Sequence, residues 1–392
     1  MVKLAQAMHR LGTETAFEVL QRARQLEARG REIVHLEIGE PDFDTPAHIV
    51  EAAVEALRRG ETHYTPSAGI PPLREAIAAY VARTRGIPVD ADQVVVVPGG
   101  KPIIFFTILS LCEPGDEVIY PNPGFPIYES MINFVGARPV PIPLCMERGF
   151  RLDLDELADL FSPRTKLVIL NSPHNPTGSV LGPEDLRAIA EMVLRTEAMV
   201  LSDEIYSRIL YDGAFHSIAS VPGMAERTVI LDGFSKTYAM TGWRLGYGVM
   251  PRELAPHITR LMTNSNSCTA TFVQYAGIAA LQGDQTPVDR MVEAFRKRRD
   301  VVLQGLQEVP GFRCACPSGA FYVFPEIRGT GLSAREMQDY LLDEAGVATL
   351  AGTSFGAYGE GFIRLSYANS VENLQKALAR IREAVARLPR KG

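Results

Sequence analysis

The 392-residue chain is predicted to adopt an α/β fold, in which a mixed, mostly parallel sheet is covered by helices on both faces and a smaller α+β domain stands beside it. Between residues 94 and 249, short apolar runs without strict alternation recur between helical stretches, a pattern typical of strands buried on both faces. After about residue 285 a long charged helical stretch ends this alternation of strands and helices. The chain is also longer than one ordinary core, which favours two domains.

The first ninety residues are expected to form three helices and one strand. Thr45 has the side chain of a helix N-cap, and Pro46 suits the first helical position because no N–H is needed there. Glycine after a helical stretch is a common stop signal. The helices are expected at 13–29, 46–59 and 72–85, followed by Gly30, Gly60 and Gly86, and the strand is expected at 32–38.

The middle of the chain alternates between buried strands and helices. The strands are expected at 94–97, 117–120, 138–142, 166–170, 199–202, 228–231 and 245–249, and the helices at 102–111, 126–134 and 184–194. Ligands of open α/β sheets bind beyond the carboxyl ends of the strands. The residues that follow each strand are therefore the first candidates for a functional site.

The C-terminal part is expected to be the smaller α+β domain. Ser333 and Glu336 form a capping-box pattern at the start of a helix that stops at Gly346. The other helices are expected at 288–309 and 371–388, and the strands at 320–324 and 362–366. We predict an N-terminal arm that joins the small domain (1–45), a large ligand-binding domain (46–284) and a small C-terminal domain (285–392).

Composition narrows the range of partners. The net charge is -6 and Lys and Arg form no block, so neither nucleic acid nor an anionic membrane is an expected partner. No run approaches the roughly 18 apolar residues of a membrane-spanning helix, and the first thirty residues lack an apolar signal core. The five cysteines lack the paired spacing of a zinc site, so free thiols and no metal centre are expected. These features favour the cytoplasm.

The stretch from Leu231 to Gly246 carries the densest chemistry. A buried strand ends in Gly-Phe-Ser-Lys, which puts the Lys236 amine beside the Ser235 hydroxyl, and Arg244 follows eight residues later. An amine, a hydroxyl and a guanidinium together suit a ligand with an aldehyde and a phosphate. Pyridoxal phosphate is such a ligand, and its enzymes hold it through an imine bond to a lysine. A single lysine after a strand is more often a solvated surface residue, so the other strand ends decide between the two interpretations.

Three further strand ends carry groups that fit the same ligand. Gly100 and Lys101 open a helix, where backbone N–H groups attract a phosphate. Asn175, fixed between prolines, suits a phenolic oxygen, and so does the hydroxyl of Tyr206. The Asp203 carboxylate would keep an aromatic nitrogen protonated. Each feature alone is more simply a tight turn, a loop or a surface acid, but strands one βαβ unit apart should bring these side chains to one edge of the sheet.

These motifs resemble those of the class I and II aminotransferases, which are fold type I among the pyridoxal-phosphate enzymes. The motifs are Asn175-Pro176-x-Gly178, Asp203-x-x-Tyr206 and Ser235-Lys236 with Arg244, within a similarity that runs from Gly39-Glu40-Pro41-Asp42-Phe43 to Arg364-Leu365-Ser366-Tyr367. The resemblance implies ping-pong transfer of an amino group from an L-amino acid to a 2-oxo acid such as 2-oxoglutarate. Aspartate, alanine and aromatic amino acids all stay open as donors. The resemblance also implies a homodimer with shared active sites.

The resemblance further implies a role for each motif residue. Lys236 would bond the cofactor and move the substrate proton, while Asp203 would pair with the pyridine nitrogen. Arg364 would grip the substrate α-carboxylate with its planar fork. The ring oxygen would be held by Asn175 and Tyr206, and the substrate also by Gly39 and Asn175. The phosphate would lie among Gly100, Lys101, Ser235 and Arg244, with Tyr64 reaching it from the neighbouring subunit and Phe125 stacking over the ring.

Departures from the family pattern and rival functions also bear on the prediction. Many aspartate aminotransferases carry Trp where this chain has Phe125. Lys101 matches a lysine that reads a side-chain carboxylate in some bacterial relatives, but the residues after it differ, so a preference for acidic donors is not implied. Gly352-Thr353-Ser354-Phe355-Gly356 fits the nucleophile elbow of α/β-hydrolases, yet all seven histidines precede it, whereas that fold needs one downstream. A lyase or synthase on the same scaffold would use the same residues and stays open.

Overall fold

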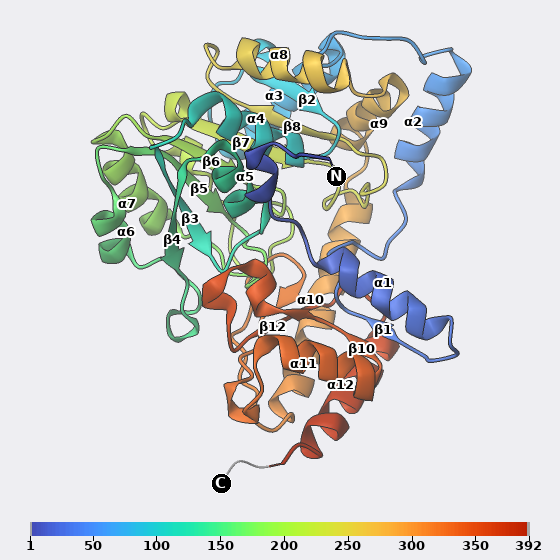
Figure 1. Ribbon diagram of the computed structural model, residues 1–392. Helices are drawn as coiled ribbons and strands as arrows, with labels where there is room; N and C mark the ends of the chain where they lie inside the picture. The colour runs from blue at the N-terminus through green and yellow to red at the C-terminus, as the bar shows by residue number, and fades with distance from the viewer. Residues whose placement is uncertain (1, 390–392) are drawn as a thin grey trace.

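The computed structural model describes residues 2–389, and its largest element is a seven-stranded sheet (Figure 1). The strand order is β2-β8-β7-β6-β5-β3-β4, and all neighbours are parallel except that β8 is antiparallel to both β2 and β7. The strands are β2 (Val94–Val97), β3 (Glu117–Asn122), β4 (Arg138–Pro143), β5 (Thr165–Asn171), β6 (Met199–Asp203), β7 (Thr228–Gly233) and β8 (Gly246–Val249). The predicted mixed, mostly parallel sheet is confirmed.

Helices cover both faces of this sheet, which explains the unbroken apolar runs. Val94 and Val96 pack with α2, α3 and α9 on one face, while Val95 and Val97 pack with α4, α5 and α8 on the other. A strand buried on both faces needs apolar residues at every position. The helices here are α2 (Ala47–Arg58), α3 (Pro71–Arg85), α4 (Lys101–Leu111), α5 (Ile127–Val135), α6 (Leu154–Leu160), α7 (Pro183–Leu194), α8 (Ala255–Asn266) and α9 (Thr271–Gln282).

The C-terminal part builds a three-stranded antiparallel sheet in the order β11-β12-β9 and a two-stranded parallel sheet of β1 and β10. Because β1 belongs to the N-terminal segment, the first and last parts of the chain lie side by side, as Figure 1 shows for the blue α1 and the red-orange elements. The strands are β1 (Val34–His35), β9 (Tyr322–Val323), β10 (Val347–Ala348), β11 (Leu350–Ala351) and β12 (Ile363–Ser366), and the helices are α1 (Ala16–Glu27), α10 (Thr286–Gln307), α11 (Ala334–Tyr340) and α12 (Val371–Ala386).

Several element predictions need correction. Thr45 does not cap α2, because its hydroxyl donates to the Ala239 carbonyl at 2.7 Å and accepts from Trp243 Nε1 at 2.9 Å, so tertiary partners take the side chain from the helix end. The strand predicted at 32–38 shrinks to two residues. Helices α6, α8 and α9 were not predicted at all. The Ser333–Glu336 capping box is confirmed at the start of α11.

Other sequence expectations concern thiols and membranes. All five cysteines lie in the described part of the chain and are free. Within residues 2–389, no helix combines the length and the apolar character needed to cross a membrane.

Candidate active site

The carboxyl ends of β5, β6 and β7 open into a cavity of about 510 Å³. This volume is typical of a site for a small molecule or cofactor. Tyr64 lies outside the cavity and is 88% exposed. Every other predicted site residue lines it: Gly39, Gly100, Lys101, Phe125, Asn175, Asp203, Tyr206, Ser235, Lys236, Arg244 and Arg364.

The sheet register explains why these residues meet. Asn171 at the end of β5 lies opposite Asp203 at the end of β6, and Asp203 lies opposite Leu231 on β7. The Asn171 amide donates to the Asp203 carbonyl at 3.0 Å and accepts from the backbone N–H of Asn175 at 2.9 Å. Asn171 therefore fixes the loop that carries Asn175 beside the next strand end. Sequence reasoning missed this role, because the recognised motif begins only at Asn175, four residues later.

The Asp203 carboxylate is buried and held by two donors. The Tyr128 hydroxyl donates to its Oδ2 at 2.6 Å, and the backbone N–H of Ile205 donates to Oδ1 at 3.2 Å. Burial raises the pKa of Asp203 to about 6, and the two hydrogen bonds oppose that rise. Tyr128 was missed by the sequence analysis; it lies in the first turn of α5, and its ring centroid is 5.7 Å from that of Phe125, which precedes the helix.

Lys236 follows β7, and its side chain is half-buried where it lines the cavity. Its Nζ donates to the Gly39 carbonyl at 2.5 Å. Burial lowers the pKa of Lys236 to about 8, which makes a neutral, nucleophilic amine accessible near neutral pH. The close approach needs glycine at position 39, because a Cβ there would lie 2.1 Å from the Tyr322 hydroxyl oxygen.

A cradle for an anion lies at the start of α4. Gly100 is the N-cap of that helix, and Gly99 has a φ of +82°. A Cβ on Gly99 would lie 1.9 Å from Arg244 Nη2, so the missing side chain makes room for the guanidinium. Arg244 itself has a φ of +55°, a conformation that costs a non-glycine residue about 1–2 kcal/mol and is concentrated at functional sites. Helix N–H groups, the guanidinium and the nearby Ser235 hydroxyl fit a phosphate.

Arg364 comes from β12, in the smaller sheet, and its side chain is buried. Its Nη1 donates to Asn175 Oδ1 at 3.2 Å and its Nη2 donates to the Glu37 carbonyl. Its Nε finds no hydrogen-bond partner among the described residues. The guanidinium lies 4.5 Å from the ring centroid of Tyr322, whose hydroxyl is 2.8 Å from that of Tyr206. A buried cation with a spare donor fits a carboxylate ligand. Tyr322 was missed by the sequence analysis, and no local pattern marks it.

Lys101 and Glu14 form an ion pair at the rim of the cavity. The Lys101 ammonium also lies 5.7 Å from the ring centroid of Phe125. The sequence analysis did not single out Glu14, which comes from the segment before α1.

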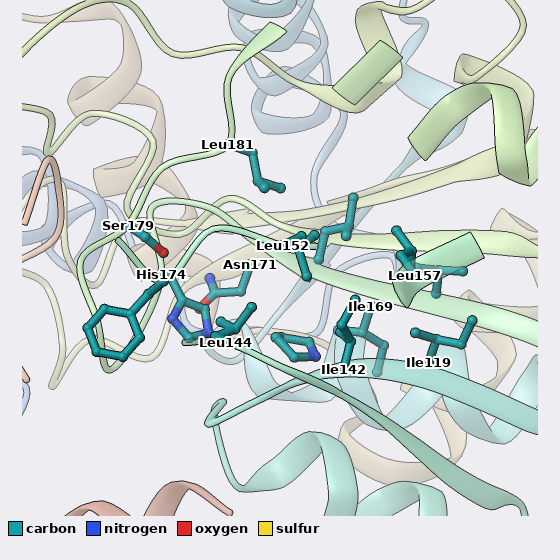
Figure 2. A pocket seen from close by; sticks show the side chains of 14 residues that line it. Ile119, Ile142, Leu144, Leu152, Leu157, Ile169, Asn171, His174, Ser179 and Leu181 are labelled. Atoms are coloured by element: carbon teal, nitrogen blue, oxygen red, sulfur yellow. The ribbon is translucent and has the colours of Figure 1, made fainter. Parts of the chain in front are cut away.

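A second cavity lies among the side chains of β3, β4 and β5 and is shown in Figure 2. Its volume is about 20 Å³, which suits about one water molecule and excludes a cofactor. His174 lines this cavity beside Asn171; its Nδ1 lies 2.8 Å from Thr177 Oγ1, and burial lowers its pKa to about 3. His174 is therefore a neutral core residue, and the chemistry lies in the larger cavity.

The chain matches a family model for "Aminotransferase class I and II" over residues 31–381. An arginine–pyruvate transaminase of Pseudomonas aeruginosa is 42% identical over 373 residues, which cover 95% of this chain and 95% of that protein. An aspartate aminotransferase of Musicola paradisiaca is 39% identical over 388 residues, 98% of this chain and 97% of the other.

A solved structure gives the same result. The aspartate aminotransferase of Thermus thermophilus with maleate superposes with a TM-score of 0.94 at 38% identity, covering 98% of this chain and 100% of that one. The chain is therefore similar to known aminotransferases in both sequence and fold over nearly its whole length.

Proposed function

The chain belongs to the class I and II aminotransferases and is a transaminase, and we propose that it uses pyridoxal phosphate bound to Lys236 to move an amino group from an L-amino acid to a 2-oxo acid such as 2-oxoglutarate. The observation that carries this proposal is the half-buried Lys236 amine, with its lowered pKa, in a cavity that it shares with Asp203 and Arg364. The amine can bond the cofactor, the carboxylate can pair with the protonated ring nitrogen, and the guanidinium can bind the α-carboxylate of the substrate. A lyase or synthase finds no support among these relatives.

The residues present fit the cofactor at both of its ends. At the phosphate end, Gly99 leaves space that a side chain would fill, and Arg244 occupies it. At the opposite end, the Asp203 carboxylate is buried with no cation beside it in the described part of the chain, so a protonated pyridine nitrogen would supply the missing partner. We propose that the backbone N–H groups of Gly100 and Lys101 and the side chains of Ser235 and Arg244 hold the phosphate, Asn175 and Tyr206 the ring oxygen, and Phe125 the ring face.

Pyridoxal phosphate, when bound, supplies an electron sink that makes the substrate Cα–H acidic. Lys236 Nζ would take the substrate Cα proton as general base and deliver it, as general acid, to the cofactor rather than back to Cα. The depressed pKa of about 8 suits both tasks at neutral pH. Arg364 orients the substrate through its α-carboxylate, with Gly39 and Asn175 beside it, and the burial of Arg364 keeps water away from the contact.

We also propose a homodimer with shared sites. Tyr64 is 88% exposed and lies outside the cavity of its own chain, which supports a role at the phosphate of the neighbouring subunit. The same proposal includes a cytoplasmic location, since the five thiols are unpaired. We further propose units at 1–45, 46–284 and 285–392, supported by the separate sheets and by the pairing of β1 with β10.

Lys236→Ala tests the proposal directly. The variant should lose the visible absorbance of the bound cofactor and at least about 10³-fold in the glutamate formed from 2-oxoglutarate and a donor. Lys297→Ala is the matched control, because Lys297 is an exposed lysine on α10 with 71% of its side chain accessible. Turnover retained by Lys236→Ala would refute the proposal.

The donor is the remaining question within this function. The relatives are named for arginine, aspartate and aromatic amino acids, and alanine also stays open. Screening the twenty amino acids against 2-oxoglutarate would identify the donor.

A further inference from the structure

Glu14 is held at the rim of the cavity by contacts on both sides of it. The Ser130 hydroxyl donates to the Gly12 carbonyl at 3.1 Å, and the Thr15 hydroxyl donates to Ser354 Oγ at 2.6 Å. These bonds tie the segment to α5 on one side and to the turn after β11 on the other. The Glu14 side chain is only 17% exposed. Its carboxylate therefore has a defined place in the cavity wall.

Glu14 neutralises Lys101, which is the cation that would otherwise bind a side-chain carboxylate of the donor. The two side chains form an ion pair, and 43% of the Lys101 side chain is still accessible. The charge of Glu14 also acts on Lys236 and Arg364, in both cases opposing the fall in pKa that burial causes. Glu14 lines the same cavity as Lys236 and Arg364, so its charge lies beside the space in which a substrate would bind.

The charged side chains that line the cavity determine which donor side chain can be accommodated beside them. Under the proposed function, the cofactor and the substrate α-carboxylate engage four of the charged side chains that line the cavity: Asp203, Lys236, Arg244 and Arg364. Two carboxylates and one ammonium remain, from Glu14, Glu40 and Lys101, and Glu40 accepts a hydrogen bond from the Thr241 hydroxyl. The net charge of these three side chains is negative. A donor carboxylate would have to displace Glu14 from Lys101 and then stay near it, whereas a donor cation would find an acceptor.

We propose that Glu14 sets the charge preference of the donor site, so that it disfavours donors with a side-chain carboxylate and favours donors whose side chain ends in an ammonium or guanidinium group. This inference rests on the proposed function, because the charge count assumes the cofactor and Arg364 roles. Specificity of this kind arises from repulsion of the wrong ligand as much as from attraction of the right one.

The test compares the holoenzyme with Glu14→Gln, which keeps the size and hydrogen-bonding ability of the side chain and removes its charge. Glu18→Gln is the matched control, because Glu18 is exposed one turn further along, in α1. For each protein, kcat/KM is measured with L-arginine, L-aspartate and L-alanine. In parallel, calorimetry gives the dissociation constants of two unreactive analogues without the amino group, 5-guanidinopentanoate and succinate.

The expected result is a wild-type preference for arginine over aspartate that falls at least about tenfold in Glu14→Gln. The alanine value is the reference for both charged donors, because alanine carries no side-chain charge, and alanine turnover also shows that the variant is folded. Glu14→Gln should also bind 5-guanidinopentanoate more weakly and succinate more tightly than the wild type does. Glu18→Gln should match the wild type in all of these measurements.

Two different failures are distinguishable. If alanine is a normal substrate but the ratio of arginine to aspartate is unchanged in Glu14→Gln, the Glu14 inference is wrong and the proposed function stands. If no donor reacts with the wild type, the proposed function fails, and unchanged analogue affinities would then overturn the Glu14 inference as well.

Discussion

Replacing Arg85 by methionine should destabilise the protein by about 3–5 kcal/mol, because it leaves two carboxylates buried without their cation. Arg85 is the last residue of α3 and donates from Nε to Glu204 Oε2 at 2.9 Å and from Nη2 to Asp232 Oδ2 at 2.7 Å. The three side chains are at most 3% exposed. Methionine keeps most of the apolar stem and removes only the charge and its donors.

The magnitude follows from the contacts that are lost and those that stay. Each charge-assisted hydrogen bond contributes about 1.5–3 kcal/mol, so two contribute about 3–6 kcal/mol. Glu204 keeps the hydroxyls of Ser202 and Ser217, and Asp232 keeps the backbone N–H of Gly233. Because these donors remain, the expected loss at neutral pH stays below the top of that range, at about 3–5 kcal/mol.

The loss should depend on pH. Burial raises the pKa of Asp232 to about 6, and Arg85 opposes this rise, so the pKa must climb further in Arg85→Met. A carboxyl whose folded pKa lies above its unfolded value of about 3.9 binds its proton more tightly in the native state. The variant therefore recovers stability relative to the wild type as the pH falls from its own higher pKa towards about 6, and the recovery is complete below that pH, where Asp232 is protonated in both folded proteins.

Urea unfolding followed by circular dichroism, at one fixed protein concentration, would measure both effects at pH 7.5 and pH 5.5. Arg83→Met is the control, since Arg83 is exposed two residues earlier in the same helix and should change stability by no more than about 0.5 kcal/mol. A wild-type midpoint for Arg85→Met at pH 7.5, or an equal loss at both pH values, would refute the reasoning.

Three further predictions concern titration. Tyr128→Phe removes a hydrogen bond that lowers the pKa of Asp203, so the acid limb of the kcat/KM profile should move to higher pH; an unmoved limb in steady-state assays would count against this role. The bond to Glu37 raises the pKa of His35 to about 9, so its stabilising contribution is complete below pH 6.5 and is lost as the pH rises through 9; His35→Gln should lower Tm at pH 6 but not at pH 10, as scanning calorimetry would reveal. The neutral amine of Lys236 reacts, so borohydride trapping of cofactor on it, followed by mass spectrometry, should increase with pH and level off above about 8.

The sheet and its strand ends were predictable because their signals are local. A run such as 94–97 must be apolar at every position when both faces are covered, and that pattern is visible in the sequence. The βαβ spacing then brings successive strand ends together, so the neighbourhood of Asn175, Asp203 and Lys236 followed from chain order. The boundaries were less predictable: β1 keeps only two residues, because its one pairing partner, β10, is equally short.

The remaining site residues come from segments that are far away in sequence. Tyr322 reaches Tyr206 across 116 positions, and Glu14 reaches Lys101 across 87. No periodicity or spacing can reveal such contacts, because they depend on how the N-terminal segment and the smaller sheets pack against the large one. Thr45 does not cap α2 for the same reason, because its hydroxyl forms hydrogen bonds with Ala239 and Trp243, which are distant in sequence.

The pair Asp203-Glu204 shows why the environment of an acid decides its function. Successive residues at a strand end point in opposite directions, so the two carboxylates meet different surroundings. Asp203 faces the cavity, where Tyr128 supplies a neutral donor and no cation touches it. Glu204 faces the other way and is neutralised by Arg85. A buried carboxylate whose charge is already paired stabilises the fold, whereas one that has donors but no cation leaves room for a cationic ligand. Among the described residues that line the cavity, only Asp203 meets that condition.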